Sequence, residues 1–148
     1  PGLSAEEKAA AKARAAELRA EARAKKAEDK LAAEAAAYDE ALAATEGLDQ
    51  ELLLALGEIV DAEAPHLTRK TMYGMPAFAR DGKTVFFFQP ALKFKTRYAT
   101  LGFDQAAPLD DGELWATSFA LTGMSPATRT TITELVRRAG EPLEGSAA

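Results

Sequence analysis

Few residues in this sequence could carry out catalysis. His66 is the only histidine, and the chain has no cysteine, so thiol nucleophiles, thiolate zinc sites and iron–sulfur ligation are all excluded. A Ser-His-Asp triad would have to be built on His66, which follows Pro65 at the end of an expected helix. No nucleophile-elbow motif or glycine-rich phosphate loop accompanies it. The sequence therefore favours a binding protein over an enzyme.

Basic residues alternate near the middle of the chain. An extended backbone would place Lys93, Lys95 and Arg97 on one face, opposite Phe94 and Tyr98. One interpretation is a patch that binds a phosphate, a nucleotide or an anionic partner. The other is an edge strand or a solvated sheet face, whose charges prevent unwanted strand pairing.

Aromatic and methionine side chains form a second candidate binding set. The turn around Pro76 can present Tyr73 and Met75 at the rim of a pocket, together with Trp115. Met and Trp suit adaptable apolar binding. Packing in the hydrophobic core is the default interpretation for this set, including Tyr73 and Met75, and most of all for the neighbouring Phe78.

Carboxylates gather in two places. On a helix expected from Leu48, the side chains of Glu51, Glu58 and Asp61 fall within an arc of about 80°, opposite the apolar stripe. Without cysteine or a histidine cluster, a metal site here would use these oxygen ligands. The alternative is the solvated face of an amphipathic helix. A second acidic group at residues 110–113 coincides with a turn signal.

The elements that must position these residues begin with a helical arm, residues 1–46. Residues 5–46 contain no glycine or proline and are rich in alanine, the best helix former. Ser4 and Glu7 form a capping box at its start. We expect one continuous helix, or two with a bend near Glu28-Asp29, and a largely solvated surface up to Lys30.

A compact domain is expected over residues 47–140, followed by a flexible tail, residues 141–148. Helix 48–64 has an apolar stripe, and a strand over 70–80 is interrupted at residues 73–76. Asp81-Gly82 predicts a type I′ hairpin turn into strand 84–89. Further strands are expected over 94–103 and 114–121. Ser125-Pro126 opens a last helix that Gly140 closes. The prediction is an α+β protein, a two-layer sandwich of an antiparallel sheet and helices.

Several of these motifs resemble the YdhG-like family of bacterial domains of unknown function. They are residues 73–78 (YGMPAF), 81–83 (DGK), 87–89 (FFQ), 93–103 (KFKTRYATLGF), 109–112 (LDDG) and 115–121 (WATSFAL). The match covers about residues 48–139 and is similar to the branch with an N-terminal helical arm. Members are often labelled iron chaperones by analogy with frataxin. The resemblance therefore implies weak iron binding, for which Glu51, Glu58 and Asp61 are the candidate ligands.

Two classes of function follow from the sequence. The first is a chaperone-like protein that binds iron weakly. The second is an interaction module, in which the arm and the basic strand bind a protein or ribonucleoprotein partner. The net charge of −5 argues against direct DNA binding. No apolar run reaches the roughly 18 residues of a membrane span, and the first residues lack an apolar signal core. A cytoplasmic location without membrane association is expected.

Overall fold

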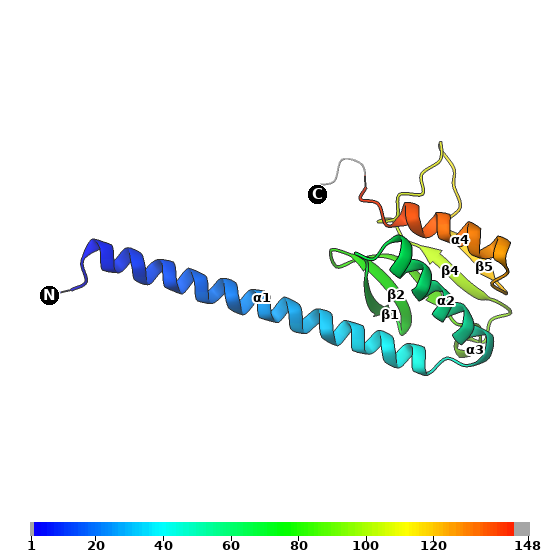
Figure 1. Ribbon diagram of the computed structural model, residues 1–148, viewed down its shortest axis with the longest axis horizontal. Helices are drawn as coiled ribbons and strands as arrows, with labels where there is room; N and C mark the ends of the chain where they lie inside the picture. Colours follow the sequence, from blue (N-terminus) through cyan, green and yellow to red (C-terminus); the bar gives the residue numbers. More distant parts are fainter. Residues whose placement is uncertain (1, 144–148) are drawn as a thin grey trace. The chain divides into compact units, whose positions relative to one another are not determined.

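The computed structural model describes residues 2–143, so part of the predicted tail, residues 144–148, lies outside the described residues. Two helices, the first of them long, are followed by five strands, with a short helix between the third and fourth strands and the last helix after the fifth (Figure 1). This arrangement confirms the predicted α+β class. The chain divides into two compact units, Pro1–Ala33 and Glu34–Ala148.

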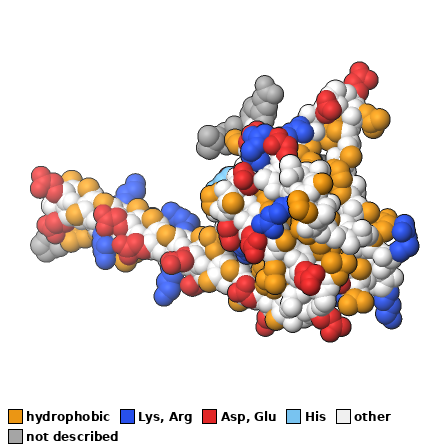
Figure 2. Space-filling view, turned by 45° about the vertical axis from the view of Figure 1, so that its right-hand side comes forward, with side chains coloured by type: hydrophobic (Ala, Val, Ile, Leu, Met, Phe, Trp, Pro, Cys, Tyr) orange, Lys and Arg blue, Asp and Glu red, His pale blue; other side chains and the backbone are white. Residues whose placement is uncertain are grey.

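Helix α1 is one continuous helix, Ala5–Ala43, as expected from its alanine content. The Ser4 Oγ accepts a hydrogen bond from the Glu7 amide at 3.1 Å, which confirms the Ser4 side of the predicted capping box. Within the smaller unit every helical residue is exposed except Ala15, which is half-buried. Figure 2 shows acidic and basic side chains spread along this part of the helix. The predicted solvated surface is confirmed.

Two helices of the larger unit pack together on one face of the sheet (Figure 1). Helix α2, Gly47–Glu63, buries the predicted stripe, which consists of Leu52, Leu53, Leu56, Ile59 and Val60. Helix α4, Pro126–Ala139, begins where the Ser125 Oγ accepts the Thr128 amide at 3.3 Å, and it is capped at Gly140. Both ends of α4 therefore agree with the sequence signals.

The sheet is an antiparallel meander in which the strands lie in sequence order. Its strands are β1 (Thr68–Met72), β2 (Met75–Arg80), β3 (Lys83–Gln89), β4 (Ala99–Phe103) and β5 (Ser118–Leu121). Asp81 and Gly82 have φ angles of 50° and 82°, which confirms the type I′ turn. Tyr73 and Gly74, at 50° and 77°, make a second turn of this kind. The segment predicted as one interrupted strand is thus a hairpin.

Two strand boundaries differ from the prediction. Residues 94–98 are not extended, because the one-turn helix α3, Ala91–Phe94, precedes β4 and Lys95 is left-handed with φ 55°. Strand β5 begins at Ser118 rather than near Leu114. Its neighbour β4 ends at Phe103, whose amide bonds to the Thr117 carbonyl at 2.7 Å. Residues 114–116 lie beyond this hydrogen bond, where β4 has ended and offers no strand to pair with.

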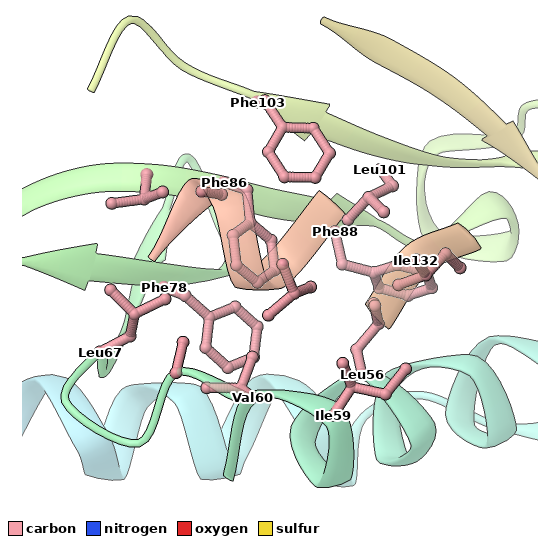
Figure 3. Packing of buried hydrophobic residues seen from close by; sticks show 14 of the residues in the cluster. Leu56, Ile59, Val60, Leu67, Phe78, Phe86, Phe88, Leu101, Phe103 and Ile132 are labelled. Carbon is pink, nitrogen blue, oxygen red and sulfur yellow. The ribbon is translucent and has the colours of Figure 1, made fainter. Parts of the chain in front are cut away.

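A row of phenylalanine rings lies between the sheet and α2 (Figure 3). Phe78 stacks on Phe86 with ring centroids 4.7 Å apart, Phe86 lies 5.3 Å from Phe103, and Phe103 meets Phe119 edge-on at 5.8 Å. The rings come from β2, β3, β4 and β5 in turn, so one aromatic row links four strands. Leu56 and Ile132 belong to the same buried cluster.

The last turns of α1 are joined to this core by Tyr38 and Arg69. Tyr38 is 2% exposed, and its ring meets Phe78 edge-on at 5.4 Å. The Arg69 guanidinium lies 5.4 Å from both ring centroids and donates hydrogen bonds to the Gly57 carbonyl and to Asp61. Burial raises the pKa of Tyr38 above its usual value of 10.0, although Arg69 opposes the rise. The hydroxyl therefore stays protonated at neutral pH.

Over residues 2–143, no helix combines the length and the apolar character that crossing a membrane requires.

Candidate functional site

The candidate site is centred on residues 91–98, called the basic segment below. It follows Pro90, and its first turn is α3. The Asp49 carboxylate, only 5% exposed, accepts hydrogen bonds from the amides of Ala91 and Leu92, both at 3.0 Å. These amides have no partner within the short helix, and a carboxylate is the best acceptor for them. Asp49 thus folds the segment into a compact turn.

The three predicted cations all lie on the basic segment and are exposed. The Lys93 Nζ donates to the Gly74 carbonyl at 2.9 Å and lies 5.5 Å from the Phe94 ring centroid. Arg97 lies 5.0 Å from the Tyr98 ring centroid. Within residues 2–143 none of Lys93, Lys95 and Arg97 has an ion pair. The segment therefore presents three cations without carboxylate partners.

The prediction that these cations share one face of an extended strand is wrong. Lys93 ends α3, Lys95 is left-handed and Arg97 lies in a bend before β4, so they do not alternate along a strand. The edge-strand interpretation is also excluded, because β4 lies between β3 and β5 in the sheet. Charges at this position do not protect a free strand edge, and that explanation for the cations no longer applies.

A cavity of about 420 Å³ adjoins the basic segment. Its lining includes Gly74, Pro76, Pro90, Leu92 and Lys93, and also Ala41, Thr45, Glu46 and Asp49. Tyr73, next to Gly74, is 88% exposed, and Leu92 is 63% exposed. The cations therefore lie beside exposed apolar surface, a combination that suits a partner with both anionic and apolar groups.

The other two members of the predicted aromatic set lie elsewhere. Met75 is buried in the core. Trp115 is in the β4–β5 loop and lines a different cavity, of about 310 Å³, with Phe103, Asp104 and Leu109. Tyr73 and Trp115 are therefore not brought to one pocket.

The predicted carboxylate ridge on α2 is exposed, but two of its members are engaged. Glu58 pairs with Arg129 of α4 at 3.0 Å, and Asp61 pairs with Arg69 of β1 at 3.0 Å. Glu51 has no ion pair among the described residues. Within residues 2–143, no group of three or more His, Cys, Asp or Glu side chains is arranged to hold a metal ion. Two of the three carboxylates predicted to bind iron are thus already paired with arginines.

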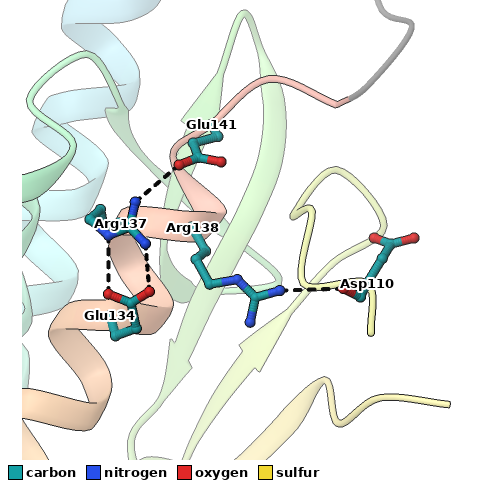
Figure 4. Close-up of polar contacts among 5 residues, drawn as sticks. All are labelled: Asp110, Glu134, Arg137, Arg138 and Glu141. Carbon is teal, nitrogen blue, oxygen red and sulfur yellow. Dashed lines mark hydrogen bonds and ion pairs between the residues drawn. The ribbon is translucent and has the colours of Figure 1, made fainter. Parts of the chain in front are cut away.

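His66 and the second acidic group both make contacts at the end of α4. The His66 Nε2 lies 2.6 Å from the Gly140 carbonyl oxygen and donates to it. Arg138 donates to the Asp110 carbonyl at 3.3 Å, while Arg137 binds Glu134 and Glu141 (Figure 4). The hydrogen bond from Arg137 lowers the pKa of Glu134. These contacts hold the loop and the helix end together.

Sequence reasoning missed Asp49, the residue that positions the basic segment. A signal was present, because Asp49 is three and four residues before Leu52 and Leu53 and so falls on the apolar stripe of α2. A carboxylate on a buried stripe needs a polar partner. Its partners, the amides of residues 91 and 92, lie too far along the chain for a pattern to reveal.

The fold and the site define the class of this protein as an α+β domain with an exposed cationic turn. No protein-family model, curated protein or solved structure matches the chain.

Proposed function

We propose that this chain is a non-enzymatic interaction module whose basic segment binds an anionic group of a protein or ribonucleoprotein partner. The observation that carries the proposal is the set of exposed, unpaired cations at Lys93, Lys95 and Arg97. The chain has a net charge of −5, and Arg69, Arg129 and Arg137 of the larger unit pair with carboxylates. Cations left without such partners raise the local potential and attract anionic groups.

Two further features support this proposal. The backbone of the basic segment is fixed by Asp49, so little conformational entropy is lost when a partner binds. The exposed Tyr73 and Leu92 add apolar area beside the charges. The resemblance of residues 48–139 to YdhG-like domains agrees with a binding role, since that family has no agreed reaction.

The test replaces Lys93, Lys95 and Arg97 together with glutamine. We expect this variant to lose the partner in pull-downs, because charge-assisted contacts contribute about 1.5–3 kcal/mol each when they are partly desolvated. The melting temperature should hardly change, since the three side chains are exposed. Quantitative mass spectrometry of captured proteins and RNA, beside a thermal melt, measures both effects.

The matched control replaces Lys83, Arg129 and Arg137 with glutamine, which alters the net charge equally. Two of these cations already have carboxylate partners, so the control should keep the partner. If the Lys93/Lys95/Arg97 variant retains the partner as well as the control does, the basic segment is not the binding surface.

Weak iron binding is a second candidate, which the family resemblance supports. Any iron on α2 would compete with Arg129 and Arg69 for Glu58 and Asp61, so we expect low affinity.

Replacing Glu51 and Glu58 with Gln and Asp61 with Asn should lower the affinity for iron further and leave the fold intact, because exposed ion pairs contribute only about 0–1 kcal/mol. Ferrous iron titration followed by calorimetry measures the effect. A control with Glu17, Glu21 and Glu28 changed to Gln should titrate like the parent. An unchanged titration of the α2 variant would remove this helix as the iron site.

A further inference from the structure

Ten of the fourteen charged residues of α1 within the smaller unit lie in two separate rows, and Glu7, Arg14, Lys25 and Asp29 lie on the rest of the helix. At 3.6 residues per turn one arc of about 60° holds basic residues and no acidic ones. This basic row consists of Lys8, Lys12, Arg19, Arg23, Lys26 and Lys30. A second arc of about 60° holds the acidic row, which consists of Glu6, Glu17, Glu21 and Glu28. The rows run along opposite flanks of one helix face.

The face between the two rows is apolar and flat. Within residues 5–30 it consists of Ala9, Ala13, Ala16, Ala20, Ala24 and Ala27. Leu31 continues it. Alanine side chains are short, so a second helix can approach this face closely. The residues recur at intervals of four, three and four, a repeat of eleven residues that keeps the face on one side of a nearly straight helix.

Most charges of the two rows have no partner within the helix. The ion pairs of residues 5–33 are those of Arg14 with Glu17 at 3.2 Å and with Glu21 at 3.8 Å. Within the described residues the basic row has no ion pair at all. Several like charges are instead four residues apart, as in Lys8 and Lys12 or Arg19 and Arg23, which is unfavourable in an isolated helix. Like charges at this spacing do not stabilise a solvated single helix.

We infer that residues 9–31 pair with the same segment of a second copy of the chain as a parallel, in-register two-helix coil. In a parallel two-fold pair the basic flank of each helix faces the acidic flank of the other, whereas in an antiparallel pair each flank faces itself. The spacing also fits, because flanking charges in parallel coils meet at positions i and i+5. Lys12 then meets Glu17 of the second copy, and Arg23 meets Glu28.

This pairing is weak and sensitive to salt. The alanine face buries little apolar area per residue, so the charge rows decide both the partner and the orientation. Exposed ion pairs are screened when the Debye length falls to about 3 Å near 1 M salt. The dimer therefore forms at low ionic strength and high protein concentration, and dissociates as salt is added.

Charge reversal tests the pairing. One variant carries Lys12→Glu and Arg23→Glu, and the other carries Glu17→Lys and Glu28→Lys. In sedimentation equilibrium at low salt, the parent should approach twice its 15.7 kDa mass. Each variant alone should associate about tenfold more weakly or worse, and an equimolar mixture should recover the parent's association. Circular dichroism confirms that the helix is retained. A monomeric parent at all concentrations, or variants that associate like the parent, would overturn the inference.

Engineered thiols determine the direction, because the chain has no cysteine of its own. Ala13→Cys and Ala27→Cys should each form disulfide-linked homodimers under mild oxidation. A mixture of the two should yield few cross-links between position 13 and position 27. Ala22→Cys, on the far side of the helix, is the matched control and should cross-link slowly. Cross-links mainly between positions 13 and 27 would show antiparallel pairing and would overturn the parallel arrangement.

Discussion

Replacing Phe78 with alanine is expected to lower the free energy of unfolding by about 3–5 kcal/mol, the range for removing a buried aromatic ring. Phe78 is 0% exposed, and its ring contacts Phe86, Tyr38 and the Arg69 guanidinium. Its removal leaves a cavity at one end of the aromatic row. The substitution also removes one of the two aromatic rings that lie against the Arg69 guanidinium.

Urea denaturation followed by circular dichroism measures this effect. Leu54→Ala is the control, because Leu54 is a large apolar residue of α2 that is 50% exposed. Its replacement should change stability by no more than about 0.5 kcal/mol. Equal losses for the two variants would mean that the packing around Phe78 is not as described.

Replacing Asp49 with alanine is expected to destabilise the larger unit by about 2–3 kcal/mol and to loosen the basic segment. The change leaves the amides of Ala91 and Leu92 without an acceptor, and hydrogen bonds to a charged group contribute about 1.5–3 kcal/mol. Because α3 is a single turn, it has few other contacts to keep it folded. Asp49→Asn, which preserves the shape and one acceptor oxygen, should have an intermediate effect.

Hydrogen exchange of the two amides measures the local effect, and urea denaturation measures the global one. Glu51→Ala is the control on the same helix, since Glu51 is exposed and has no ion pair within the described residues. It should leave both exchange rates unchanged. Slow exchange at Ala91 and Leu92 in the Asp49→Ala variant would show that another group holds the segment.

The elements that were predicted correctly are those whose causes are local. Alanine content specifies α1, the Ser125-Pro126 pair specifies the start of α4, and Asp81-Gly82 specifies a hairpin turn. Residues 94–98 were predicted incorrectly because their alternating pattern is typical of a strand. The turn they form instead is imposed by Asp49, more than forty residues earlier in the chain. Hydrogen bonds between distant segments leave no periodic signal.

The same distinction between local and long-range causes applies to the candidate site. The exposure of the cations and of the α2 carboxylates follows from local patterns, and both were predicted. Their partners do not follow from such patterns. Arg129 and Arg69 reach Glu58 and Asp61 from α4 and β1, and only the packing of those elements brings the charges together. The separation of Tyr73 from Trp115 likewise depends on the order of the strands.

The contact of Tyr38 with Phe78 and Arg69 determines where the chain can be cut. The arm predicted from composition extends to residue 46, but the larger unit begins at Glu34. A protein shortened to start at residue 47 would lose Tyr38 and leave Phe78 and Arg69 without the ring that covers them. A truncation at Glu34 keeps that ring. This truncation removes the charged helix and leaves the larger unit intact, so the role of each part can be measured independently.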